Sequence, residues 1–144
     1  MRKWVGENDR SYFWAGRGKG ADACQWQIAL RAEVAGSLGV GAVSPLVDFV
    51  QCFECISYKR VLEQAQVYGL NLDCLRVILA IYQAPRRLTS GDATAAATLI
   101  AHRGAMAGSQ WAMALLRVAL LPAMDAHFAA FPSGFKAVFV DDVS

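Results

Sequence analysis

The sequence predicts an α+β domain in which a small antiparallel sheet packs against several helices. Three patterns support this fold class: apolar residues at helical spacing in three segments, two short apolar runs of strand composition, and a Ser-Gly-Asp turn inside a potential hairpin. With 144 residues the chain has the length of one domain. Apolar residues make up 56% of it, above the ~45–50% of an average globular domain. A substantial core is therefore expected.

Residues 1–20 are expected to form an extended, basic, glycine-rich opening segment. They show neither a helical nor a strand period, and basic residues outnumber acids there. The charged residues of the segment are Arg2, Lys3, Arg10, Arg17 and Lys19 against Glu7 and Asp9. Its Gly16–Gly20 stretch does not fit a phosphate-binding loop. The pattern G-x-x-x-x-G-K-[ST] would place Phe13 at the first glycine and Gly20 at the hydroxyl position.

Four helices are expected along the rest of the chain. The first runs from residue 21 to residue 35, with apolar residues every three or four positions: Ala23, Trp26, Leu30 and Val34. Two apolar stripes, 58–65 and 72–82, predict helices that we interpret as packing surfaces. They end at Gly69 and Pro85, and Asn71 is the expected N-cap of the second. A long helix is expected from residue 109 or 110 to residue 131, kinked near Pro122.

The strands are expected in three places. Residues 46–53 follow Pro45 and contain Asp48, a carboxylate that must either face the surface or meet a positive partner. Residues 86–100 can form a hairpin, although the alanines at 95–97 would equally favour a helix. A last run, residues 136–140, follows Gly134 and stops at two adjacent acids.

These two acids, Asp141 and Asp142, predict a divalent metal site. Neighbouring carboxylates repel one another unless a cation or a proton intervenes. The alternative is an exposed acidic tail. Asp48 lies on another expected strand, and if the strands pair, the acids can assemble a two-metal site for phosphoryl transfer. Side chains alternate along a strand, so we expect Asp48 and Asp141 to be the main ligands. A two-metal nuclease is a lesser alternative.

The sequence favours an intracellular protein of the nucleus or cytoplasm. Polar residues interrupt its longest apolar stretch, 105–131, and no signal peptide or membrane span is expected. The four cysteines, Cys24, Cys52, Cys55 and Cys74, include one C-x-x-C. Without a second pair or a nearby histidine we interpret them as buried or half-buried thiols, with a metal or redox site as the alternative.

Four blocks of the sequence resemble motifs of reverse transcriptases, the RNA-directed DNA polymerases of retroelements. The stretch Asp48-Phe49-Val50-Gln51-Cys52-Phe53-Glu54 resembles the palm motif D-x-x-x-A-F-D, and Phe139-Val140-Asp141-Asp142 resembles [YF]-x-D-D. Arg103-Gly104-Ala105-Met106-Ala107-Gly108 resembles the loop R-G-x-x-Q-G. Residues 13–23 are similar to the G-F-x-x-G-R-S-x-x-D-A segment that precedes the palm in retroelement and group II intron enzymes. The blocks occur in the family's order and cover nearly the whole chain.

The resemblance implies a partial fingers and palm domain with a nucleotidyl-transfer site. It assigns residues 1–20 to a remnant of the fingers and 21–144 to a palm truncated at its acidic strand, with the other fingers and the thumb outside the chain. It implies two Mg²⁺ or Mn²⁺ ions, an RNA or DNA template-primer and deoxynucleotides. By this resemblance the metal ligands are Asp48, Asp141 and Asp142, and the nucleotide- or template-binding residues are Phe53, Arg103, Gly104, Gly108, Arg17 and Lys19. Phe53 would crowd the 2′-hydroxyl of the incoming nucleotide.

Several positions depart from the family's pattern. Ala107 stands in place of Gln, Ala112-Met113 in place of Ser-Pro, and Cys52 and Glu54 in place of Ala and Asp. The departures affect nucleotide and template binding more than metal binding, because the three carboxylates are intact. We therefore expect little activity from the chain alone. The alternative function is a non-catalytic remnant or a nucleic-acid-binding module derived from a retroelement.

Overall fold

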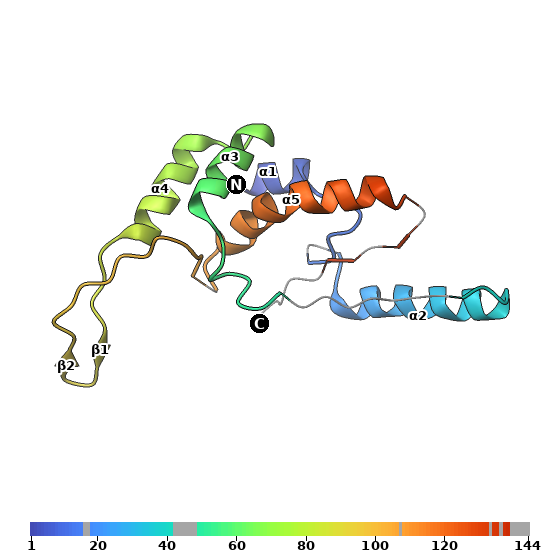
Figure 1. Cartoon of the computed structure of the whole chain (residues 1–144), viewed down its shortest axis with the longest axis horizontal. Coiled ribbons are helices and arrows are strands. Elements are labelled where there is room, and N and C mark those ends of the chain that lie inside the picture. Colours follow the sequence, from blue (N-terminus) through green and yellow to red (C-terminus); the bar gives the residue numbers. More distant parts are fainter. Residues whose placement is uncertain (16–17, 42–48, 107, 133, 136, 139–144) are drawn as a thin grey trace. The chain divides into compact units, whose positions relative to one another are not determined.

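The computed structural model describes residues 1–15, 18–41, 49–106, 108–132, 134–135 and 137–138 (Figure 1). Within these residues it contains five helices and one two-stranded antiparallel sheet, so the α+β class is confirmed. The chain forms two compact units, Met1–Asn8 with Val50–Asp125 and Asp9–Phe49 with Ala126–Ser144. The assignment of residues 1–20 to the fingers and of residues 21–144 to the palm does not follow these units and stays a prediction.

Three helices supply most of the core of the first unit: α3 (Tyr58–Val67), α4 (Leu72–Gln83) and the first part of α5 (Ala112–Ala130). Their buried side chains include Tyr58, Val61, Ala65, Leu75, Ile78, Leu79, Tyr82, Leu115, Leu116, Val118 and Leu121. Burial of each large apolar side chain contributes about 1.5–3 kcal/mol. The two central stripes were thus interpreted correctly as packing surfaces.

The ends of α3 and α4 follow the signals in the sequence. The Asn71 side chain accepts a hydrogen bond from the backbone N–H of Cys74 at 2.8 Å, as an N-cap does. Ser57 caps α3 with a longer bond of 3.4 Å from the N–H of Arg60. Between the helices Gly69 has φ +67°, a left-handed conformation that favours glycine. The predicted end points of both helices are confirmed to within two residues.

A short helix, α1 (Arg2–Glu7), corrects the expectation of an extended opening segment. Trp4 is buried, and its indole N–H donates to the backbone carbonyl of Tyr68 at 2.7 Å. A helix of six residues is too short to be stable alone or to show a period. Contacts of Trp4 with a segment more than sixty positions away therefore explain a helix that local sequence did not predict.

The hairpin is confirmed, and the helical alternative for the same segment is wrong. Strands β1 (Thr89–Ser90) and β2 (Ala93–Thr94) pair in antiparallel register, with Gly91 at φ +57° in the turn. Nearer its base, Arg86 and Leu99 exchange two backbone hydrogen bonds of 2.9 and 2.8 Å. Every residue from Gln83 to Ile100 is exposed. Within the first unit the hairpin projects away from α3 and α4 (Figure 1).

The second unit contains α2 (Ala21–Ser37), which confirms the first predicted helix. Its apolar stripe, however, faces water: Trp26 is 76% exposed, and Leu30 and Val34 are about half exposed. On this helix Cys24 is the one fully buried side chain among the described residues. The spacing predicted the helix, but a period does not tell which of two apolar faces is covered.

The long helix α5 is apolar enough, by length and composition, to cross a membrane. Buried helices of soluble proteins meet the same criteria, and α5 supplies core side chains to the first unit. Arg117, near its middle, is buried as well. Pro122 lies inside the helix, and the kink expected near it stays a prediction. The expectation of a chain without a membrane span stays a prediction.

Candidate functional site

The predicted metal ligands Asp48, Asp141 and Asp142 lie outside the described residues, as does Arg17. In the part of the chain that is described, no three His, Cys, Asp or Glu side chains gather so as to hold a metal ion. The two-metal site, with Mg²⁺ or Mn²⁺, therefore stays a prediction. The other predicted site residues are described, and several of them meet.

Two of the sequence blocks pack against one another in the first unit. The N–H of Gly104 donates to the carbonyl of Ile56, and the N–H of Ala105 donates to the carbonyl of Phe53, both at 2.8 Å. Ser57 and Arg103 form an antiparallel bridge beside these bonds. We call residues 103–109 the Gly104 loop. We call residues 50–56 the Phe53 segment. It lies about fifty positions before the Gly104 loop in the sequence, so only the fold brings the two together.

Glycine is required at position 104 for two reasons. Its φ is +91°, a backbone conformation that side chains strongly disfavour. A Cβ atom there would also lie 3.0 Å from the carbonyl oxygen and 3.2 Å from the Cα of Glu54, which are backbone atoms that cannot move aside easily. The close approach of the two blocks thus depends on this glycine. Gly108 also has a positive φ, +79°, but has open space around it.

The segment before the contact differs from the predicted strand at 46–53. Residues 42–48 lie outside the described part, and residues 50–55 form a turn in which the N–H of Cys55 donates to the carbonyl of Gln51 at 3.0 Å. Gln51 has φ +50°. The turn presents the carbonyls of Phe53 and Ile56 to the Gly104 loop. The apolar composition of residues 46–53 predicted a β-strand, whereas the described backbone after residue 49 forms a turn and pairs with the Gly104 loop.

Two tyrosines from the helical pair hold the Gly104 loop. The Tyr58 hydroxyl of α3 donates to the carbonyl of Gly104 at 2.8 Å. The Tyr82 hydroxyl of α4 donates to Ser109 Oγ at 2.8 Å, and Ser109 Oγ also accepts the N–H of Trp111 at 3.3 Å. Apolar spacing placed both tyrosines on packing stripes and did not indicate this role. A signal was present, because a buried tyrosine hydroxyl usually needs a partner.

The electrostatics of Tyr58 keep it a neutral donor. Burial raises the pKa of its hydroxyl above the usual 10; the nearby Arg86 guanidinium opposes this rise and Tyr82 adds to it. The hydroxyl therefore carries its proton at physiological pH and can donate to Gly104. Arg86 itself donates to the carbonyl of Tyr82 at 2.7 Å, at the end of α4. Arginine at a helix C-terminus satisfies carbonyls that lack a helical partner.

In the second unit, Phe13 of the N-terminal block pairs with Val138, the residue that precedes the fourth block; that block itself lies outside the described residues. Phe13 and Val138 form a parallel bridge, in which the N–H of Val138 donates to the carbonyl of Tyr12 at 2.7 Å and the N–H of Trp14 donates to the carbonyl of Val138 at 3.1 Å. Phe13, Tyr12 and Val138 are buried. The run that leads to the terminal acids thus lies beside the N-terminal block. Its predicted pairing with the Asp48 strand falls outside the described residues.

Known proteins add no guide to these contacts. No protein family, curated protein or solved structure matched the chain. The motif blocks and the contacts of their residues are therefore the observations that bear on function.

Lys19, a predicted nucleotide-binding residue, has local partners. Its Nζ forms an ion pair with Asp9 at 3.0 Å and donates to the carbonyl of Arg10 at 3.2 Å. A phosphate would have to compete with this carboxylate. The role of Lys19 in nucleotide binding stays a prediction.

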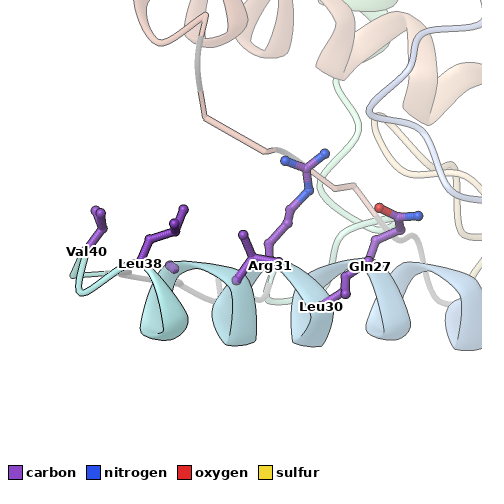
Figure 2. Close-up of a pocket in the computed structure, with 7 residues that line it drawn as sticks. Gln27, Leu30, Arg31, Leu38 and Val40 are labelled. Carbon is purple, nitrogen blue, oxygen red and sulfur yellow. The ribbon is translucent and has the colours of Figure 1, made fainter.

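The second unit also has a shallow groove of about 390 Å³ along α2, shown in Figure 2. Its lining is mainly apolar and includes Leu30, Val34, Leu38 and Val40. The Arg31 guanidinium lies 4.5 Å from the centre of the Phe135 ring, a cation–π contact. Of the predicted site residues that the structure describes, none lines the groove.

The cysteines differ from one another in exposure. Cys24 is buried, which raises the pKa of its thiol, whereas Cys52 is half-buried. Cys55 and Cys74 are exposed, so the interpretation as buried or half-buried thiols is wrong for these two. Both lie at surface positions of a turn and of the first turn of α4, where apolar neighbours do not cover them. All four are free thiols.

Proposed function

We propose that this chain is a reverse-transcriptase-like protein, a partial fingers and palm segment of an RNA-directed DNA polymerase with a two-metal nucleotidyl-transfer site. The packing of the Gly104 loop on the Phe53 segment is the observation that carries the proposal. Residues that were singled out by motif, far apart in sequence, make direct backbone hydrogen bonds. In the other unit, Phe13 of the N-terminal block is bridged to Val138, which directly precedes the fourth block.

In this proposal each block has a distinct task. Phe53 lies next to the Gly104 loop and limits the space for a sugar 2′-hydroxyl, while the loop supports the template and the nucleotide. Asp48 and Asp141, assisted by Asp142, hold two Mg²⁺ or Mn²⁺ ions. Two such ions stabilise the attacking and leaving oxygens of an in-line displacement. Tyr58 fixes the loop through its bond to the carbonyl of Gly104.

Primer extension on an RNA template tests the proposal with the full chain in Mg²⁺ and in Mn²⁺. Activity is expected to fall to background in Asp141→Asn and in Asp48→Asn, because each loses a ligand charge. Asp92→Asn is the matched control, since Asp92 is exposed in the hairpin turn and should retain the parent's activity. Little activity is expected from the chain alone; activity above background that is equal in Asp141→Asn and in the parent would refute the assignment of the site.

Metal binding supplies a second readout that does not need catalysis. Titration with Mn²⁺, followed by electron paramagnetic resonance, should show binding that Asp141→Asn weakens and Asp92→Asn does not. A parent chain that binds no Mn²⁺ and extends no primer contradicts the proposal.

A non-catalytic nucleic-acid-binding module is the second candidate. The replacements Ala107 and Ala112-Met113, at positions where the family contacts nucleotide and template, favour it, as do the exposed arginines of the hairpin region. This candidate predicts binding of nucleic acid without primer extension and without Mn²⁺ binding. The two assays above therefore separate it from the polymerase.

A further inference from the structure

The part of the chain that runs from α4 through the hairpin into α5 carries an unusual distribution of charge. From Cys74 to Met124 the only carboxylate is Asp92, whereas the same span contains five arginines. Arg117 is buried in α5, and Arg76 forms an ion pair with Asp73 at 3.4 Å. Of the remaining arginines, Arg86 and Arg87 lie at the base of the hairpin, and Arg103 lies four residues beyond Leu99, at the start of the Gly104 loop.

These three arginines have different surroundings. Arg86 is engaged, because its guanidinium donates to the carbonyls of Tyr82 and Ile81 at the end of α4. Arg87, Arg103 and the adjacent His102 are exposed, and among the described residues no hydrogen bond or ion pair holds their side chains. Two guanidinium groups are therefore available to a ligand.

The backbone that carries Arg87 and Arg103 is anchored on both sides. Arg86, beside Arg87, exchanges two backbone bonds with Leu99. Arg103 is bridged to Ser57, and its neighbour Gly104 is bonded to Ile56. An anchored backbone has less entropy to lose when a ligand binds than a loose loop has. The backbone positions that carry the two exposed charges are thus fixed, while the side chains stay free to reach a ligand.

The arrangement matches a chain of phosphates. Arg103 lies four residues beyond Leu99, which limits its distance along the backbone to about 14 Å. One nucleic-acid strand rises about 3.4 Å per phosphate, so this length spans roughly four phosphates. The exposed hydroxyls of the hairpin, on Thr89, Ser90 and Thr94, are also groups that donate to phosphate oxygens. The nearby acids are Asp92 at the tip and Glu54 beside Gly104, and neither pairs with these arginines.

We propose that Arg87, at the base of the hairpin, and Arg103, at the start of the Gly104 loop, form a contact surface for the phosphate backbone of a nucleic acid. The choice of nucleic acid as the ligand rests on the proposed function, and the inference assigns the surface that the template-primer would use. Contacts to phosphate are independent of base sequence, so the hairpin fixes the position of the strand and does not read it.

Fluorescence anisotropy tests this surface with a labelled 20-base-pair RNA–DNA hybrid and the full chain. Each phosphate contact contributes a salt-dependence slope of about −0.9 for a duplex. In the variant Arg87→Ala/Arg103→Ala, the slope of log K against log salt concentration should become less negative by about 1.8. At 0.1 M salt this corresponds to an affinity loss of up to about 60-fold relative to the loss at 1 M. Arg87→Lys/Arg103→Lys keeps both charges and should keep the slope.

Arg76→Ala is the matched control, because Asp73 already neutralises this arginine. Mn²⁺ binding is measured on the same double alanine variant and should equal that of the parent, so that loss of the hairpin contact is distinguished from loss of the proposed metal site. Vesicles containing phosphatidylserine form a third arm, since Leu88, Leu99 and Ile100 are exposed near the base. An unchanged slope in the double alanine variant, an equal loss in Arg76→Ala, or binding to vesicles but not to the hybrid would overturn the inference.

Discussion

Replacement of Gly104 by alanine is the most direct test of the contact between the two sequence blocks. The change adds one methyl group at a position with φ +91°. That methyl carbon would lie 3.0 Å from the carbonyl oxygen of Glu54 and 3.4 Å from its carbonyl carbon. Since these atoms belong to the backbone, the Gly104 loop must move away from the Phe53 segment. We therefore expect Gly104→Ala to destabilise the first unit.

The magnitude follows from the groups that the movement disturbs. A left-handed conformation costs alanine about 1–2 kcal/mol relative to glycine. Displacement of the loop also lengthens the bond from the N–H of Gly104 to Ile56 and the bond from the Tyr58 hydroxyl, each 2.8 Å now. Net loss of one such bond costs about 1 kcal/mol. The expected decrease in the free energy of unfolding is about 2–4 kcal/mol in total.

Urea unfolding, followed by far-UV circular dichroism, measures this decrease. Gly108→Ala is the matched control, because Gly108 has φ +79° and nothing within 4 Å of the added atom. In Gly108→Ala the free energy of unfolding should fall only by the cost of the left-handed backbone conformation, about 1–2 kcal/mol. The excess in Gly104→Ala then reports the contact with Glu54.

A second readout locates the change. Hydrogen exchange should become faster at the N–H groups of Gly104 and Ala105 in Gly104→Ala, since both donate across the contact. If Gly104→Ala and Gly108→Ala lose the same free energy within about 0.5 kcal/mol, the close approach to Glu54 is refuted.

The remaining predictions concern the residues that support the Gly104 loop. Tyr58→Phe removes the donor to Gly104 and should lower the free energy of unfolding by about 0.5–1.5 kcal/mol. Because burial raises the pKa of Tyr58, the stabilisation by its protonated hydroxyl is complete below pH 10 and is lost as the pH rises through the raised value. The difference in stability between the parent and Tyr58→Phe should therefore shrink above pH 10, and a constant difference contradicts the shift. Asn71→Ala removes the acceptor for the N–H of Cys74 and should cost about 0.5–2 kcal/mol, more than Ser57→Ala with its 3.4 Å bond; equal losses would argue against the capping geometry.

Local signals in the sequence accounted for most of the helical part of the fold. Apolar spacing placed α2, α3 and α4, and Asn71 and Pro85 marked the bounds of α4 because capping and proline act within a few residues. The hairpin was predicted beside a helical alternative. The turn Gly91-Asp92 and the pairing of Arg86 with Leu99 decided between them.

The candidate site was predicted less completely. The resemblance singled out Phe53, Arg103 and Gly104, and the structure packs the segment that contains Phe53 against the loop that contains the other two. The sequence did not indicate the roles of Tyr58 and Tyr82, because a hydroxyl on a core-facing stripe meets its hydrogen-bond partner only after the helix has packed. The carboxylates Asp48, Asp141 and Asp142 lie outside the described residues, so their meeting stays a prediction.

By itself, therefore, the sequence determined the helices with strong periods, their caps and the motif blocks, since each depends on residues close together in the chain. Only the tertiary structure decided that α1 forms around Trp4, that residues 50–55 turn, and that the stripe of α2 faces water. These outcomes depend on burial and on hydrogen bonds between distant segments. Backbone groups pair with whatever partner the fold supplies, and no local pattern records which partner that is.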